Sequence, residues 1–257
     1  MNSLYHKILL FVKILIFLLY HLSGNTIGCC IMSSIYYIKI FIPNSIFITI
    51  ITSFFISFVF SLQMVKEFLY LNAVQLIGSI LSISFIRELS PVLTSIIVIG
   101  RVASLFTSQL ASMLVTEQID ALLVLGINPI NYLIIPRILS MVIGLPLLNI
   151  ISIFTSLISG SFVCFILYGI HPNVFLSSVV YNYFFLDLFK SILKTLGFAV
   201  FISITSCVWG ITSRGGSHGV GLSTTSSVIV CLILVFILNF LLSYLLFNNL
   251  ISSFEFS

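Results

Sequence analysis

Long apolar stretches, each about as long as a helix needs to cross a bilayer, recur along this sequence. Residues 46–64, 138–168 and 226–248 are such stretches, and none of them contains a charged side chain. Only 6% of the residues are charged, whereas a soluble domain carries about 25%. So few charges do not cover a water-facing surface, and no basic run follows a phosphate backbone. The sequence therefore predicts an integral membrane protein and excludes a soluble enzyme or a nucleic-acid binder.

The predicted fold class is all-α and membrane-embedded, with one domain over residues 43–250 and a polar tail at 251–257. The expected spans are residues 46–64, 90–113, 138–168, 189–210 and 226–248, each approximate. Pro43 is expected to start the first helix, and Pro91 to stand at the first helical position of the second. Residues 68–87 are either a continuation of the first span or a second, shallow helix.

The N-terminal segment, residues 1–42, predicts an amphipathic helix that lies on the membrane surface. Its apolar stretch is interrupted by Lys7 and Lys13, which can reach lipid headgroups. A first membrane span is the alternative, and no cleavage site of a targeting peptide follows. The cysteines have apolar surroundings and are expected to be small core residues. They are Cys29, Cys30, Cys164, Cys207 and Cys231.

One charged residue falls inside the second expected span. Arg101 lies near its middle, where a charged side chain costs roughly 2.5–3.5 kcal/mol to insert. Its side chain is expected to face either a polar partner such as Glu88 or an anionic group of a substrate. Small residues, Ser104 among them, recur at helical spacing and predict close helix packing or the lining of a dimer seam or cavity. Arg101, Ser104 and Glu88 are therefore the candidate substrate or cavity residues.

Residues 116–129, TEQIDALLVLGINP, predict a short helix between the second and third spans. Thr116 can cap its start, and acidic residues such as Asp120 favour the positive end of the helix. Gly126 and Pro129 predict its end, which gives a helix of about 8–10 residues with an apolar face. Such a helix is either an ordinary connection or a peg that docks into a groove of another protein.

The region that holds these features resembles the MlaE-type permease family of ABC transporters. The family pattern is roughly REL-G-PV, then GR-x-GS, then TEQIDAL, and later a G, a P and a closing PR. The matching residues are Arg87, Glu88, Leu89, Pro91, Val92, Gly100, Arg101, Ser104, Thr116, Glu117, Gln118, Ile119, Asp120, Ala121, Leu122, Gly126, Asn128, Pro129, Tyr132, Leu133, Pro136 and Arg137. Similarity in spacing and hydropathy extends over about 46–248. The many Ile and Phe residues and few Ala residues suggest an AT-biased genome, which fits the plastid-encoded algal members.

The resemblance implies a homodimer of five-span subunits that moves phospholipid or a related glycerolipid between membranes. It implies two partners, a separate ABC ATPase subunit that binds the ATP and a membrane-anchored lipid-binding protein of the MCE type. The chain itself is expected to hold no cofactor and no metal and to be no enzyme, since it lacks a G-x-x-x-x-G-K-[ST] phosphate cradle. The expected location is the inner envelope membrane of a plastid (chloroplast), or alternatively a bacterial inner membrane.

The EQIDAL segment resembles the coupling helix that docks into the ATPase. Its candidate contacts are Glu117, Gln118, Asp120 and Leu122.

The chain also departs from the family pattern. Ser90 and Ala103 stand where glycine is frequent, and Asn239 stands where aspartate is common. Two arginines that the family often carries are missing near residues 222 and 226, which could weaken a second ATPase contact or a charge pair. Two other functions are open, the first of them suggested by the missing arginines. One is a structural or assembly relic that no longer transports, and the other is an intramembrane enzyme that acts on lipid.

Overall fold

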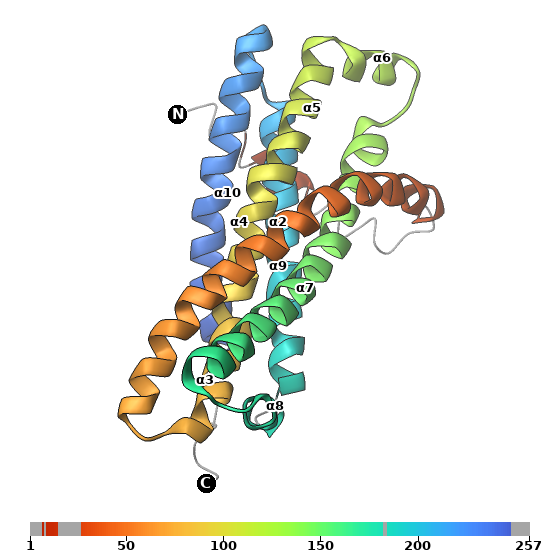
Figure 1. The fold of residues 1–257 in the computed structure, drawn as a ribbon. Coiled ribbons are helices and arrows are strands. Elements are labelled where there is room, and N and C mark those ends of the chain that lie inside the picture. Colours follow the sequence, from red (N-terminus) through yellow and green to blue (C-terminus); the bar gives the residue numbers. More distant parts are fainter. Residues whose placement is uncertain (1–6, 8, 15–26, 182–183, 248–257) are drawn as a thin grey trace. The chain divides into compact units, whose positions relative to one another are not determined.

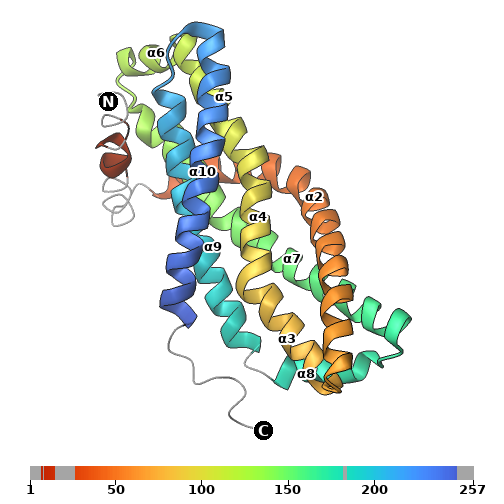
Figure 2. The ribbon, with the colours of Figure 1, turned by 90° about the vertical axis from the view of Figure 1, so that its left-hand side faces the viewer.

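The computed structural model describes residues 7, 9–14, 27–181 and 184–247, and every element in these ranges is helical (Figures 1 and 2). The predicted all-α class is confirmed, whereas the expected polar tail at 251–257 lies outside the described residues. The elements are α2 (Ile27–Tyr70), η1 (Val74–Leu76), α3 (Ile77–Ser84), η2 (Phe85–Leu89), α4 (Ser90–Val98), η3 (Ile99–Ala103), α5 (Ser104–Val115), α6 (Gln118–Val124), η4 (Ile130–Ile134), α7 (Ile135–Tyr168), α8 (Pro172–Tyr181), α9 (Phe184–Ile211) and α10 (Gly216–Phe247).

Within the described residues, five helical stretches are long and apolar enough to cross a membrane. They are Ser45–Tyr70, Ile77–Val115, Ile130–Tyr168, Phe184–Ile211 and Gly216–Phe247. The expected number of spans is confirmed, and the chain is a multi-span membrane protein. The second and third stretches begin earlier than the sequence suggested, at Ile77 and Ile130.

The second stretch begins early because residues 68–87 divide between two helices. α2 ends at Tyr70, and Asn72 adopts the left-handed conformation at φ +55°, which turns the chain. From Ile77 onward the residues are helical and run into the second span. Residues 68–87 are therefore no continuation of the first span, and from Ile77 onward they form a second helix that is part of the second span.

Pro43 does not start a helix. It lies inside α2, so the expectation that it separates two segments was wrong. Proline is unfavourable within a helix because it has no N–H and its ring crowds the carbonyl four residues earlier. The apolar stretch after it still begins where expected, since the first candidate span starts at Ser45.

Two other prolines each follow a π-helical turn. η2 ends at Leu89, two residues before Pro91, and η4 ends at Ile134, two residues before Pro136. A π turn shifts the hydrogen-bond register by one residue, so it accommodates the missing proline N–H without ending the helix. Pro91 thus lies within a continuous helical stretch and not at its start, because the π turn before it accommodates the missing N–H.

The chain divides into two compact units, and four of the five long stretches contribute a segment to each, whereas Ser45–Tyr70 lies in unit 2 except for Ser45. Unit 1 comprises residues 1–45, 96–145 and 196–236, and unit 2 comprises residues 46–95, 146–195 and 237–257. The core of unit 1 includes Leu110, Ile119, Leu133, Ile134, Ile204 and Cys207. The core of unit 2 includes Val65, Ile77, Leu81, Phe85, Ile153 and Phe175. Cys164, Cys207 and Cys231 are buried and unpaired, as expected of small core residues, whereas the side chains of Cys29 and Cys30 lie outside the described part.

Within unit 2, a glycine lets α3 approach α8 closely. A methyl group on Gly78 would collide with the Ser178 hydroxyl and would lie 2.6 Å from the Phe175 carbonyl oxygen. We therefore expect Gly78→Ala to lower the free energy of unfolding by about 1–3 kcal/mol, the usual cost of overpacking a core. The thermal unfolding midpoint of the purified protein in detergent measures this change.

Gly100→Ala is the matched control, because nothing lies within 4 Å of the methyl group that it would add. Alanine is also the better helix former by about 0.5–1 kcal/mol, so this variant should be as stable as the wild type or more stable. Equal midpoints for the two variants would contradict the close approach at Gly78.

Candidate functional site

The expected short helix between the second and third spans is present as α6, Gln118–Val124, in unit 1 (Figure 1). Its start differs from the expectation, because the Thr116 hydroxyl donates back to the Ser112 carbonyl at 3.0 Å and caps nothing in α6. The residue before the helix is instead Glu117, whose φ of +58° is left-handed. That conformation is uncommon for a residue other than glycine and is often found at functional sites.

The end of α6 follows the prediction. Gly126 has φ +72°, and its N–H donates to the Leu123 carbonyl, while the Ile127 N–H donates to the Leu122 carbonyl, each at 3.0 Å. These two bonds form a Schellman motif, in which a left-handed glycine closes a helix. Gly126 therefore ends this helix as the sequence predicted.

α6 is attached to unit 1 by one buried side chain and is otherwise largely exposed. Ile119 is only 7% exposed and packs in the core of unit 1. Glu117, Gln118 and Asp120 are exposed, and Leu122 is half-buried. Val124 is 89% exposed, which is unusual for an apolar side chain in a compact unit. The four candidate contacts thus lie on one short element that offers both acidic and apolar groups to its surroundings.

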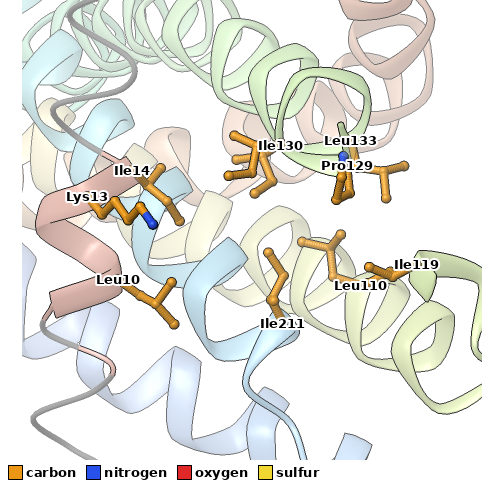
Figure 3. Close-up of a pocket in the computed structure, with 10 residues that line it drawn as sticks. Leu10, Lys13, Ile14, Leu110, Ile119, Pro129, Ile130, Leu133 and Ile211 are labelled. Atoms are coloured by element: carbon orange, nitrogen blue, oxygen red, sulfur yellow. The ribbon is translucent and has the colours of Figure 1, made fainter. Parts of the chain in front are cut away.

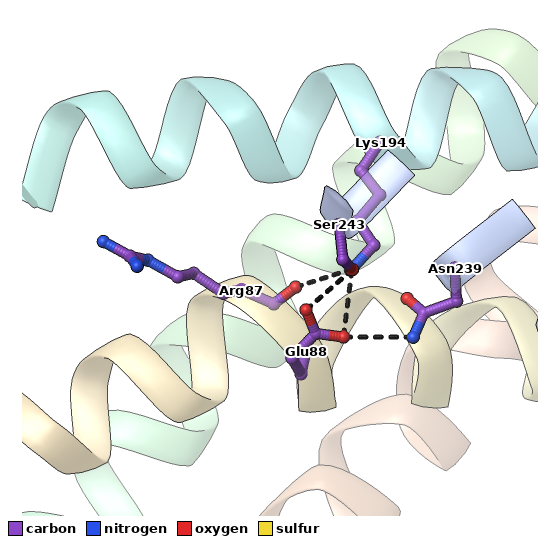
Figure 4. Close-up of polar contacts among 5 residues, drawn as sticks. All are labelled: Arg87, Glu88, Lys194, Asn239 and Ser243. Atoms are coloured by element: carbon purple, nitrogen blue, oxygen red, sulfur yellow. Dashed lines mark hydrogen bonds and ion pairs between the residues drawn. The ribbon is translucent and has the colours of Figure 1, made fainter. Parts of the chain in front are cut away.

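A polar network in unit 2 joins the second span to α9 and α10 (Figure 4). The side chain of Lys194 is completely buried, and its ammonium lies 3.1 Å from Glu88 Oε2, 2.9 Å from the Arg87 carbonyl oxygen and 2.8 Å from Ser243 Oγ. An ammonium has three N–H donors, and these three acceptors use all of them. The burial of this charge is therefore compensated by hydrogen bonds and by the Glu88 carboxylate.

Pro91 explains why the Arg87 carbonyl is available to Lys194. In an α-helix that carbonyl would accept the N–H of residue 91, which proline lacks. The lysine supplies a donor in its place, at 2.9 Å. The π turn η2 and the proline after it thus prepare an acceptor for a charged side chain from another helix.

Asn239 completes the network and accounts for a departure from the family pattern. Its side-chain amide donates to Glu88 Oε2 at 3.0 Å, and the Ser243 hydroxyl donates to Glu88 Oε1 at 2.8 Å. An aspartate at 239 would place a second negative charge beside this carboxylate, whereas asparagine offers a donor. Asparagine at this position thus makes a favourable contact to Glu88.

A second ion pair in unit 2 involves the neighbouring residue of the same π turn. Arg87 contacts Asp187 through both Nε and Nη2, at 3.0 and 2.9 Å, and its guanidinium lies 4.9 Å from the centre of the Phe247 ring. Asp187 is buried, so the pair is well shielded from water. Both charged residues of η2 therefore have ion-pair partners that are distant in sequence. Arg87 pairs with Asp187, 100 positions away, and Glu88 pairs with Lys194, 106 positions away.

The other two cavity candidates belong to unit 1. Arg101 is exposed and belongs to the π turn η3, Ile99–Ala103. The Ser104 hydroxyl donates back to the Gly100 carbonyl at 2.6 Å, as serine often does inside a helix. The third candidate, Glu88, belongs to unit 2, and its hydrogen bonds go to Lys194, Asn239 and Ser243.

Sequence reasoning assigned no role to three buried polar residues, Lys194, Asp187 and Arg137. The only signal for Lys194 was its position as a charge inside a span. Arg137 is completely buried in unit 1, its guanidinium carbon lies 5.3 Å from the centre of the Tyr37 ring and 5.6 Å from that of Phe106, and its Nη2 donates to Gln109 at 3.4 Å. Arg137 belongs to the closing PR of the motif, but the motif does not reveal that this cation lies against two aromatic rings.

Among the described residues, no group of three or more His, Cys, Asp or Glu side chains is arranged so that it could hold a metal ion. The ionisable groups that do converge, in the Glu88 network, are bound to one another by hydrogen bonds.

Comparison with known proteins identifies relatives of this chain. A probable ABC transporter permease of Pyropia yezoensis, ycf63, is 48% identical over 194 residues, which are 76% of this chain and 74% of that protein. A probable ABC transporter permease of Synechocystis, slr1045, is 43% identical over 194 residues, 76% of this chain and 74% of the relative. The Arabidopsis thaliana protein TRIGALACTOSYLDIACYLGLYCEROL 1, chloroplastic, is 40% identical over 76% of this chain and 55% of its own length.

The family comparison agrees with these relatives. The profile described as Permease MlaE matches residues 34–245, which include all five candidate spans except the last residues of α10. The Pyropia and Synechocystis relatives are named as probable permeases, that is, as transport subunits and not as enzymes. The chain therefore belongs to the MlaE permease family of ABC transporters.

Proposed function

We propose that this permease moves a phospholipid or a related glycerolipid between membranes, driven by ATP hydrolysis on a separate subunit. An ABC transporter permease works with an ATPase, and α6 supports the proposal that the two subunits meet there. It is a capped helix between two spans that exposes acidic and apolar side chains, with Ile119 as its buried anchor. The ATP and the metal that accompanies it would be bound by the partner, and this chain would carry no cofactor.

The proposal of a lipid substrate is supported by the relatives. One of them, from Arabidopsis thaliana, carries the name of a glycerolipid and the description chloroplastic. We propose by extension a plastid inner envelope location for this chain, with a bacterial inner membrane as the alternative. The proposal further includes a homodimer and an MCE-type lipid-binding partner.

Arg101 is the proposed contact for the lipid headgroup. It is an exposed cation within the second candidate span, at a depth where a charge needs a polar or anionic neighbour. A phosphate is a suitable neighbour, because a guanidinium binds it through two parallel hydrogen bonds.

The test is ATP-dependent lipid transfer by the complex reconstituted in vesicles. We expect Arg101→Ala to slow transfer at least about tenfold, the equivalent of ~1.4 kcal/mol for one charge-assisted hydrogen bond. Arg214→Ala, the same substitution at an exposed arginine in the turn before α10, is the control and should leave transfer unchanged.

The outcomes separate the possibilities. Unchanged transfer in the Arg101 variant would remove this residue from the mechanism. A stable complex with the ATPase that neither transfers lipid nor stimulates ATP hydrolysis would favour the assembly relic over the transporter.

A further inference from the structure

Unit 1 contains an apolar pocket of about 160 Å³ beside the N-terminal helical residues (Figure 3). Leu10 and Ile14 line one side of it, and Leu133 and Ile211 come from the third and fourth spans. Every residue that lines the pocket belongs to unit 1. The pocket is therefore built inside one compact unit and does not depend on how the two units are arranged.

The lining has a single charged side chain. Lys13 lies at the pocket and is exposed, whereas the other lining residues are Leu, Ile and Pro. Figure 3 shows the lysine on the N-terminal helix, next to Ile14 and facing the apolar side chains of the other elements. A hydrocarbon wall with one cation at its edge is complementary to a hydrocarbon chain with a negatively charged head.

The volume limits the part of a ligand that the pocket can hold. An engineered apolar cavity of roughly 150 Å³ stays free of water and binds benzene, so this pocket of about 160 Å³ has room for a short hydrocarbon segment. It is too small for a complete two-chain lipid, whose remaining part would lie outside.

We propose that this pocket is a binding site for an anionic amphiphile, with a segment of its hydrocarbon chain among Leu10, Ile14, Leu133 and Ile211 and its charged head at Lys13. A free fatty acid and an anionic membrane lipid share this chemistry. The site is separate from Arg101, and it does not depend on the proposed transport of lipid.

Occupancy of the pocket has a consequence for α6. Ile119 lines the pocket and is the only buried residue of that helix among those described. A chain segment in the pocket would fill the space beside this anchor and add dispersion contacts to it. The amphiphile would thus hold the exposed helix more firmly on unit 1.

The experiment is photolabelling of the full chain in phosphatidylcholine nanodiscs. Three probes carry a diazirine on the hydrocarbon chain, namely hexadecanoic acid, phosphatidylglycerol and phosphatidylcholine. Mass spectrometry of peptides then identifies the labelled residues. We expect one or both anionic probes to label the residues around Leu133, and phosphatidylcholine to label them weakly. The acid alone would identify a free fatty acid, and phosphatidylglycerol alone would identify a membrane lipid.

Two variants test the two halves of the site. Lys13→Glu should lower labelling by the anionic probes about fivefold, the equivalent of the ~1 kcal/mol that one lysine contributes near an anionic surface. Ile211→Trp fills the pocket and should reduce labelling to background. Lys39→Glu and Ile229→Trp make the same changes at exposed positions of unit 1 outside the pocket, and should leave labelling unchanged.

Hydrogen exchange provides a readout that is independent of labelling. The anionic probe that labels the pocket, hexadecanoic acid or phosphatidylglycerol, should slow exchange of the amides of α6 in the wild type but not in Ile211→Trp, while exchange in α8 stays the same. Because Lys13 is exposed, its variant keeps the test valid even if Ile211→Trp misfolds. Labelling that is equal in wild type and both pocket variants, or equal for phosphatidylcholine and the anionic probes, would overturn the proposal.

Discussion

Replacing Glu117 and Asp120 together by lysine is expected to abolish binding of the ATPase subunit. Both residues are exposed on or beside α6, so the change should not disturb the fold. Each lost charge-assisted hydrogen bond costs about 1.5–3 kcal/mol, and two together weaken binding more than about a hundredfold. In the proposed docking, repulsion between the new lysines and the ATPase cations expected to bind the acids adds to this loss. Co-purification with the tagged chain in mild detergent, followed by ATPase activity, measures the effect.

Glu67→Lys is the matched control, because it reverses an exposed acid that lies in the other unit, on α2. It should retain the ATPase. An ATPase that binds the double variant as well as it binds the wild type would show that α6 is an ordinary connection between two spans. The absence of any ATPase even with the wild-type chain would favour the relic.

The second large effect is expected in the buried network of unit 2. Glu88→Leu leaves the completely buried Lys194 without its counter-charge. Removal of one partner from a buried ion pair costs about 3–5 kcal/mol, and we expect about 3 kcal/mol because Glu88 is itself 47% exposed. The free energy of unfolding in detergent, from denaturant titration, measures the loss.

A double-mutant cycle identifies the cause. Glu88→Leu with Lys194→Met removes both charges and should regain more than half of the lost stability, since no buried cation remains uncompensated. Glu67→Leu, the same change at an exposed acid, should alter stability little. Additive losses in the double variant would mean that Glu88 and Lys194 do not stabilise each other.

Local features of the chain were sufficient to predict the helix α6 and its end. Gly126 can adopt a left-handed conformation without strain, and Pro129 disfavours a longer helix, so the end of α6 follows from its own residues. The start was predicted less well. Thr116 has the side chain of a cap, but the preceding helix competes for its hydroxyl, and Ser112 binds it. The Thr116 hydroxyl could bond either to the helix before it or to the helix after it, and the sequence did not indicate which of the two.

By itself, the sequence determined the class of the protein, the number of spans and the family motif. These properties depend on the hydropathy of short segments and on local turn chemistry, and both are set by residues that are close together in the sequence. The tertiary structure alone decided that Lys194 would pair with Glu88 and that the Arg87 carbonyl would be its second acceptor. Those partners lie more than a hundred residues from the lysine, and each is a plausible partner for several other groups. Only the packing of particular helix faces selects among them, because a buried charge is stable where every donor finds an acceptor at once.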